Sequence, residues 1–146
     1  MEIDVVMLAY SKTEALFDMT QRAIDSLHQS ETQYKFNVIL VETGNLTGRS
    51  YTGLTALIEP VEPFNYNRFL NIGFIRCRSN IIVIANNDLI FHPAWFANID
   101  TAMIRNELDS ASPYNPGWFQ HVHLDSQERR LNLEKRSSFA FVQNNA

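Results

Sequence analysis

The chain has 146 residues and a net charge of −4, and its composition of 45% hydrophobic and 19% charged residues excludes a disordered or membrane-spanning protein. The length fits one domain with a sizeable core. Because acidic residues outnumber basic ones, we expect no nucleic-acid partner. Cys77 is the single cysteine and the N-terminus lacks a secretory pattern, so we expect a reducing cytoplasm. No apolar run approaches the roughly 20 residues of a transmembrane segment.

The first part of the sequence predicts a strand, a helix and a second strand. Residues Ile3–Ala9 form a short apolar run rich in β-branched side chains, which is typical of a buried strand. The S-x-x-E spacing at residues 11–14 is that of a capping box and precedes a helical apolar face at residues 16–27. A second strand pattern follows at Phe36–Val41. Together they predict a βαβ unit with parallel strands and a right-handed crossover.

The second part continues the alternation of strands and helices. The patterns predict a weak strand at Leu54–Ile58, a helix at Asn65–Arg76, a strand at Ile81–Ala85 and a helix at Pro93–Asn106. Residues 117–146 show no clean period. This order of elements predicts an α/β fold, a three-layer α/β/α sandwich with a mostly parallel sheet.

Polar clusters follow three of the predicted strands. They are Tyr10-Ser11-Lys12, Glu42-Thr43-Gly44 and Asn86-Asn87-Asp88. Ligands of parallel sheets bind beyond the carboxyl ends of the strands, so we expect the three clusters to face one crevice. The glycine-rich phosphate-binding patterns G-x-G-x-x-G and G-x-x-x-x-G-K-[ST] do not occur at the places where they would bind a dinucleotide or a nucleoside triphosphate.

Asp88 is a candidate metal ligand, because an acid at the end of a buried strand sits at low dielectric and needs a compensating positive charge. Mg²⁺ or Mn²⁺, held by one or two carboxylates and by substrate phosphates, would supply that charge. The alternative is that Asn86-Asn87-Asp88 ends the strand in an Asx turn. Glu42 is either a ligand of a base or ribose, or a solvated acid. His121 and His123 suit a metal or phosphate contact, or form a polar edge strand.

Four segments together resemble the nucleotide-sugar-binding half of GT-A glycosyltransferases, particularly those of family 2. In chain order they are DVVMLAYSK, FNVILVETG, FNYNRFLNIGF and IIVIANNDLIFHP. The third, Phe64–Phe74, is similar to the F-N-R-x-K-L-L-N-x-G-F stretch of β-1,4-galactosyltransferases. Asn86-Asn87-Asp88 stands where that family has its D-x-D metal motif, with an asparagine in place of the first acid, as in rhamnosyltransferase-like members. The resemblance implies one minimal, Rossmann-like GT-A domain, with its nucleotide-sugar-binding part at 1–106 and an abbreviated acceptor or C-terminal part at 107–146.

The same resemblance implies roles for individual residues. Those expected to bind the nucleotide sugar are Ala9, Tyr10, Ser11, Glu42, Phe64, Arg68, Asn71, Asn86 and Asn87. Asp88 would hold a divalent metal, Mn²⁺ or Mg²⁺, with His121 or His123 as a further ligand. No Glu-Asp pair follows Asp88, so Asp125 is the candidate general base for an acceptor hydroxyl.

The resulting hypothesis is a metal-dependent glycosyltransferase that transfers a hexose from a UDP-sugar, with UDP-glucose as the first candidate donor. The acceptor is an unidentified glycan, lipid or protein, and without it slow hydrolysis of the donor is the expected turnover. Two alternatives stay open. One is a non-catalytic nucleotide-sugar-binding or assembly module, and the other is an α/β interaction domain whose three polar clusters do not share a crevice.

Overall fold

The computed structural model describes residues 1–113 and 139–142, and the chain divides into two compact units, Met1–Pro93 and Ala94–Ala146. The elements of the first unit are β1 (Glu2–Ala9), α1 (Glu14–Ser30), β2 (Lys35–Glu42), β3 (Ala56–Ile58), α2 (Tyr66–Phe74) and β4 (Ile82–Ala85). Those of the second are α3 (Trp95–Asn106), β5 (Ser110–Pro113) and β6 (Phe139–Val142), and β5 pairs with β6 in parallel. Of the helices in these described ranges, none is long and apolar enough to cross a membrane.

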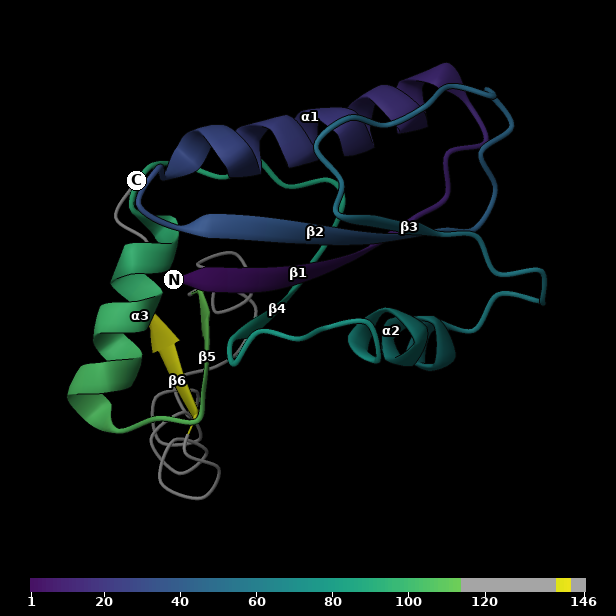
Figure 1. Ribbon diagram of the computed structural model, residues 1–146. Coiled ribbons are helices and arrows are strands. Elements are labelled where there is room, and N and C mark those ends of the chain that lie inside the picture. The colour runs from purple at the N-terminus through teal and green to yellow at the C-terminus, as the bar shows by residue number, and fades with distance from the viewer. Residues whose placement is uncertain (114–138, 143–146) are drawn as a thin grey trace, which may run out of the picture. The chain divides into compact units, whose positions relative to one another are not determined.

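The sheet of the first unit has the strand order β3-β2-β1-β4, and each of its pairs is parallel. In Figure 1, α1 lies over one face of this sheet and α2 over the other. The structure therefore confirms the predicted α/β fold with a mostly parallel sheet flanked by helices. The predicted strands and helices match the observed ones closely, although β3 has only three residues.

The core of the first unit follows from the apolar runs of β1 and β2. Side chains on both faces of β1 are buried, which is the pattern of a parallel strand covered on both sides. On α1, the buried positions repeat at helical spacing, as expected for one face packed on the sheet. They are Phe17, Thr20, Ala23, Ile24, Leu27 and Ser30.

The starts of two helices differ from the sequence predictions. The N-cap of α1 is Thr13, whose hydroxyl accepts from the Leu16 N–H at 3.3 Å, so the predicted capping box beginning at Ser11 is wrong. Ser11 is buried instead, and its N–H donates to Glu42. Helix α3 begins at Trp95 rather than at Pro93, because Ala94 adopts a left-handed conformation with φ of 64°.

Gly73 lets α2 approach the sheet closely. A Cβ atom at this position would lie 2.5 Å from Val6 Cγ1 and 3.3 Å from Val41 Cγ2, and both of these side chains belong to buried strand residues. Glycine costs helix stability relative to alanine, so its place inside α2 is explained by this contact rather than by helix propensity.

We therefore expect Gly73→Ala to destabilise the protein by about 1–2 kcal/mol, because overpacking outweighs the gain of about 1 kcal/mol in helix propensity. Urea unfolding followed by circular dichroism measures the loss. Asn67→Ala, an exposed change on the same helix, serves as the control and should be neutral or slightly stabilising. If Gly73→Ala were as stable as the natural protein, α2 would not be held against Val6 and Val41 as observed.

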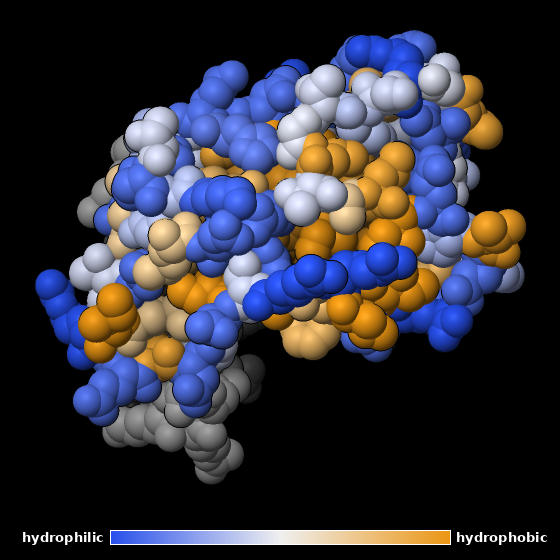
Figure 2. All heavy atoms as spheres, in the orientation of Figure 1, coloured by the Kyte–Doolittle hydropathy of each residue, from blue (hydrophilic) through white to orange (hydrophobic). Residues whose placement is uncertain are grey.

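The surface of the first unit carries exposed apolar side chains as well as charged ones. Figure 2 shows apolar side chains in the middle of the visible face with hydrophilic side chains to either side. Large exposed apolar residues include Leu46, Val61, Phe64, Phe74 and Ile75. Of these, Phe64 belongs to the cavity described next.

Candidate functional site

A cavity of about 320 Å³ lies at the carboxyl ends of β1 and β4, within the first unit. This is the edge of a parallel sheet at which ligands bind. Strand ends, the start of α1 and the region around the start of α2 all contribute to its lining. The lining residues are Leu8, Ala9, Tyr10, Leu16, Met19, Thr43, Phe64, Tyr66, Leu70, Ile84, Ala85, Asn86 and Asn87.

Three aromatic side chains, Tyr10, Phe64 and Tyr66, lie at the cavity and are largely exposed. A Cβ atom at Gly44 would lie 2.6 Å from the Tyr10 ring, so only glycine leaves this ring its present position. The ring of Phe64 packs edge-on against Phe69, with 5.4 Å between the ring centroids. Flat apolar faces that remain exposed at a cavity suit the stacking of a planar base.

Beneath the cavity edge, the Glu42 carboxylate joins the ends of β1 and β2. The side chain is 1% exposed, and Oε1 accepts from the N–H groups of Ser11 at 2.9 Å and Gly44 at 3.0 Å. Oε2 accepts from the Tyr51 hydroxyl at 2.6 Å. Because the Tyr51 proton goes to Glu42, the Ser11 hydroxyl is the donor in its short hydrogen bond to Tyr51. Burial, and next the hydrogen bond to Glu42, raise the pKa of Tyr51, which keeps the phenol protonated as the donor.

The loop that carries Tyr51 is fastened to α1. The Tyr51 ring stacks on Phe17 with 4.2 Å between the centroids. Arg49 forms ion pairs with Glu14 at 2.7 Å and Asp18 at 2.6 Å. These contacts fix the loop after β2, and the Glu42 carboxylate in turn fixes the residues next to Tyr10.

The structure brings together five of the residues predicted to bind a nucleotide sugar. Ala9, Tyr10, Phe64, Asn86 and Asn87 all line the cavity. The side chain of Asn87 donates to the Thr20 hydroxyl at 2.9 Å, whereas Asn86 is exposed.

The other four predicted nucleotide-sugar residues do not line the cavity. Ser11 and Glu42 are buried beneath it, and at 1% exposure the Glu42 carboxylate offers almost no surface to uracil or ribose. Arg68 is paired with Glu62 at 2.5 Å, and Asn71 is exposed.

Asp88 is exposed, and this corrects the expectation that it sits at low dielectric. The reason lies in the sheet order, because β4 is an edge strand in the described sheet and its Ile84 is 59% exposed. Across residues 1–113 and 139–142, no three His, Cys, Asp or Glu side chains form a metal-binding group. His121, His123 and Asp125 lie outside the described residues.

Several lining residues were not predicted from the sequence. Tyr66 and Leu70 lie one helical turn apart on α2, and Leu16 and Met19 lie three residues apart on α1. Their spacing marks one face of each helix, but only the packed structure shows that the two faces border the same cavity. Thr43 donates its hydroxyl to the Ala9 carbonyl at 3.0 Å and so links the ends of β2 and β1.

Comparisons with protein families, with curated proteins and with solved structures found no match.

Proposed function

We propose that the first unit is a Rossmann-like, three-layer α/β/α nucleotide-sugar-binding domain of the GT-A type, and that the protein is a glycosyltransferase using a UDP-hexose donor. The observation that carries this proposal is the cavity at the carboxyl ends of β1 and β4, where five residues from distant parts of the sequence meet as the resemblance implies. The proposed location is a reducing cytoplasm, because the single cysteine of the sequence cannot form a disulfide within the chain.

In this proposal each part of the cavity has a binding role. The exposed faces of Tyr10 and Phe64 would hold the uracil ring, and the amides of Asn86 and Asn87 would hydrogen-bond the ribose and diphosphate. A volume of about 320 Å³ falls in the lower range of small-molecule sites, so it accommodates part of a nucleotide sugar, with the remainder extending into solvent.

In this proposal a divalent cation would be held weakly by Asp88, which follows the lining residue Asn87 but does not itself line the cavity. Asp88 offers one exposed carboxylate in the same turn as Asn87, and Mg²⁺ or Mn²⁺ commonly takes one or two carboxylates together with substrate phosphates. When bound, such an ion would act as a Lewis acid on the departing diphosphate. Asp88 would bind it, and Asn86 would position the donor beside it. The proposed base Asp125 and the proposed ligands His121 and His123 stay predictions from the sequence.

The test of this proposal is calorimetric titration with UDP in the presence and absence of Mn²⁺. We expect Mn²⁺-dependent binding that Asp88→Asn weakens about tenfold or more, because one charge-assisted contact is removed. Since Asp88 is exposed, the same change should alter the free energy of unfolding by less than about 0.5 kcal/mol. Glu59→Gln removes an exposed acid that is not next to any lining residue in the sequence and is the matched control.

Two further measurements test where UDP binds and whether the protein releases UDP from a donor. Phe64→Ala should weaken UDP binding, whereas Phe74→Ala, an exposed aromatic on α2 that does not line the cavity, should not. Release of UDP from a panel of UDP-sugars supports the transferase, and UDP binding without any release favours the non-catalytic module. Absence of UDP binding at millimolar concentration with Mn²⁺ contradicts both.

A further inference from the structure

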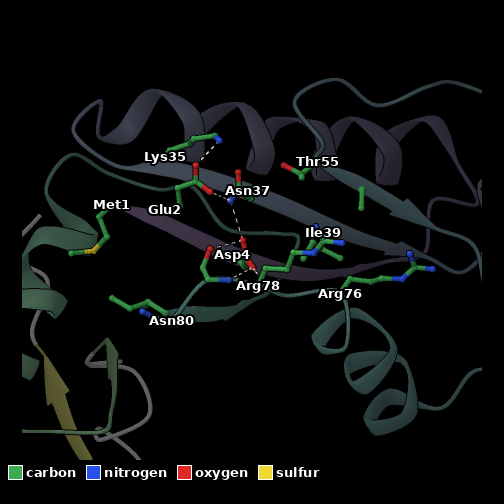
Figure 3. A pocket seen from close by; sticks show the side chains of 13 residues that line it. Met1, Glu2, Asp4, Lys35, Asn37, Ile39, Thr55, Arg76, Arg78 and Asn80 are labelled. Atoms are coloured by element: carbon green, nitrogen blue, oxygen red, sulfur yellow. Dashed lines mark hydrogen bonds and ion pairs between the residues drawn. The ribbon is translucent and has the colours of Figure 1, made fainter.

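A second and larger cavity, of about 780 Å³, lies at the amino-terminal ends of the strands of the same sheet (Figure 3). It is bordered by the first residues of β1, β2 and β3 and by the loop between α2 and β4, all within the first unit. It shares no lining residue with the cavity at the carboxyl ends of the strands. Helix α2 contacts this face of the sheet farther along the strands, where Gly73 meets Val6 and Val41.

At this cavity two polar residues lie opposite each other in register, Asp4 on β1 and Asn37 on β2. Asp4 is 4% exposed, and its Oδ2 accepts from the N–H groups of Arg78 at 2.5 Å and Ser79 at 2.9 Å. Its Oδ1 accepts from the Ser79 hydroxyl at 2.9 Å and the Asn37 amide at 3.0 Å. The carboxylate is thus met by four uncharged donors, and it holds the loop after α2 against the sheet.

The loop held by Asp4 carries two arginines, Arg76 and Arg78, whose side chains are exposed at the cavity. Figure 3 shows these side chains leading away from Asp4. Neither guanidinium forms an ion pair with any residue of the described ranges, whereas Lys35 at the same cavity is paired with Glu2 at 2.7 Å. Among the described residues, two positive charges at this cavity thus have no ion-pair partner, in a chain whose net charge is −4.

We infer that this cavity binds the phosphate group of a small, polar phosphate monoester. Guanidinium groups bind phosphate through paired N–H donors, and two of them suit a dianion. The Thr55 hydroxyl and the Asn80 amide, from other parts of the lining, offer hydrogen bonds to the remainder of the ligand. The volume is within the range of small-molecule sites. This site is independent of the proposed UDP-sugar site, because no residue is shared.

The test uses the full-length protein with glucose 6-phosphate and inorganic phosphate as probes, in calorimetric titrations at constant ionic strength. We expect glucose 6-phosphate to bind more tightly than inorganic phosphate. Arg76→Ala and Arg78→Ala should each weaken binding about tenfold, and the double variant should abolish it. Arg76→Lys should retain part of the affinity, because it keeps the charge and loses the paired donors. Arg22→Ala, an exposed arginine on α1 that lines neither cavity, should leave affinity unchanged.

Thermal unfolding without ligand should be the same in the arginine variants and the natural protein, because both side chains are exposed. UDP binding with Mn²⁺ should also be unchanged in the double variant. The phosphate site and the proposed UDP-sugar site are therefore tested independently of each other. The inference is overturned if neither probe binds at millimolar concentration, if binding is the same in the double variant, or if only a polyanion such as heparin binds.

Discussion

Glu42→Ala is expected to lower the free energy of unfolding by about 3–5 kcal/mol. The change leaves the buried N–H of Ser11, and the partly buried N–H of Gly44 and hydroxyl of Tyr51, without their common acceptor. Each unsatisfied buried donor costs about 1–3 kcal/mol, and part of this is recovered where water enters. Domains of this size are stable by about 5–15 kcal/mol, so the variant should lie close to its unfolding threshold.

Urea unfolding at neutral pH, followed by circular dichroism, measures this loss. Glu42→Gln should lose only about 1–2 kcal/mol, because its amide oxygen still accepts from the two N–H groups and its NH₂ can donate to the Tyr51 hydroxyl. Glu59→Ala, at an exposed acid, controls for the removal of a negative charge. A loss below about 1 kcal/mol for Glu42→Ala would show that the carboxylate does not hold the two strand ends together.

The elements of the first unit were predictable because their signals are local. Apolar runs long enough for a strand and too short for a helix gave β1, β2 and β4 within about one residue of their observed bounds. Gly73 did not prevent α2 from being predicted, since the flanking residues keep a helical pattern. Its reason, the contact with Val6 and Val41, joins residues far apart in the chain and is visible only in the packed structure.

The cavity at the carboxyl ends was predictable in its position and only partly in its chemistry. The rule for parallel sheets places Tyr10, Asn86 and Asn87 at one edge, and the structure agrees. The environment of Asp88 was not predictable, because it depends on β4 being an edge strand rather than a central one. The environment of Glu42 depends on Tyr51, which belongs to a polar loop without a pattern of its own.

The second cavity was not predictable from the sequence, for a related reason. Asp4 and Asn37 each interrupt an apolar strand near its beginning, and these matching positions are the sequence signal of the polar pair. Their pairing depends on the register of β1 against β2, and the two arginines depend on the loop that Asp4 holds. Single-strand periodicity contains neither fact.

Asp4→Asn should lower the free energy of unfolding by about 2–3 kcal/mol at neutral pH. The NH₂ group of the asparagine would face groups that all donate to the carboxylate in the natural protein, namely the N–H groups of Arg78 and Ser79, the Ser79 hydroxyl and the Asn37 amide. Burial alone would raise the pKa of Asp4, but the hydrogen bonds from Ser79, Arg78 and Asn37 together lower it below its ordinary value. In the folded protein the carboxyl group thus binds its proton less readily than in the unfolded chain. Its contribution to stability is present above the ordinary aspartate pKa and is lost as the pH falls through the lower, folded value.

The difference in stability between the natural protein and Asp4→Asn should therefore be largest at neutral pH and should shrink as the pH falls below about 4. Urea unfolding of both proteins across this pH range measures the difference directly. Asp25→Asn is the matched control, since Asp25 is exposed on α1 and accepts from only the Gln21 side chain in the described residues, so its effect should stay within about 0.5 kcal/mol at every pH. A difference for Asp4→Asn that does not change between neutral and acidic pH would mean that the ionised carboxylate is not what holds the loop of Arg78 and Ser79 to the sheet.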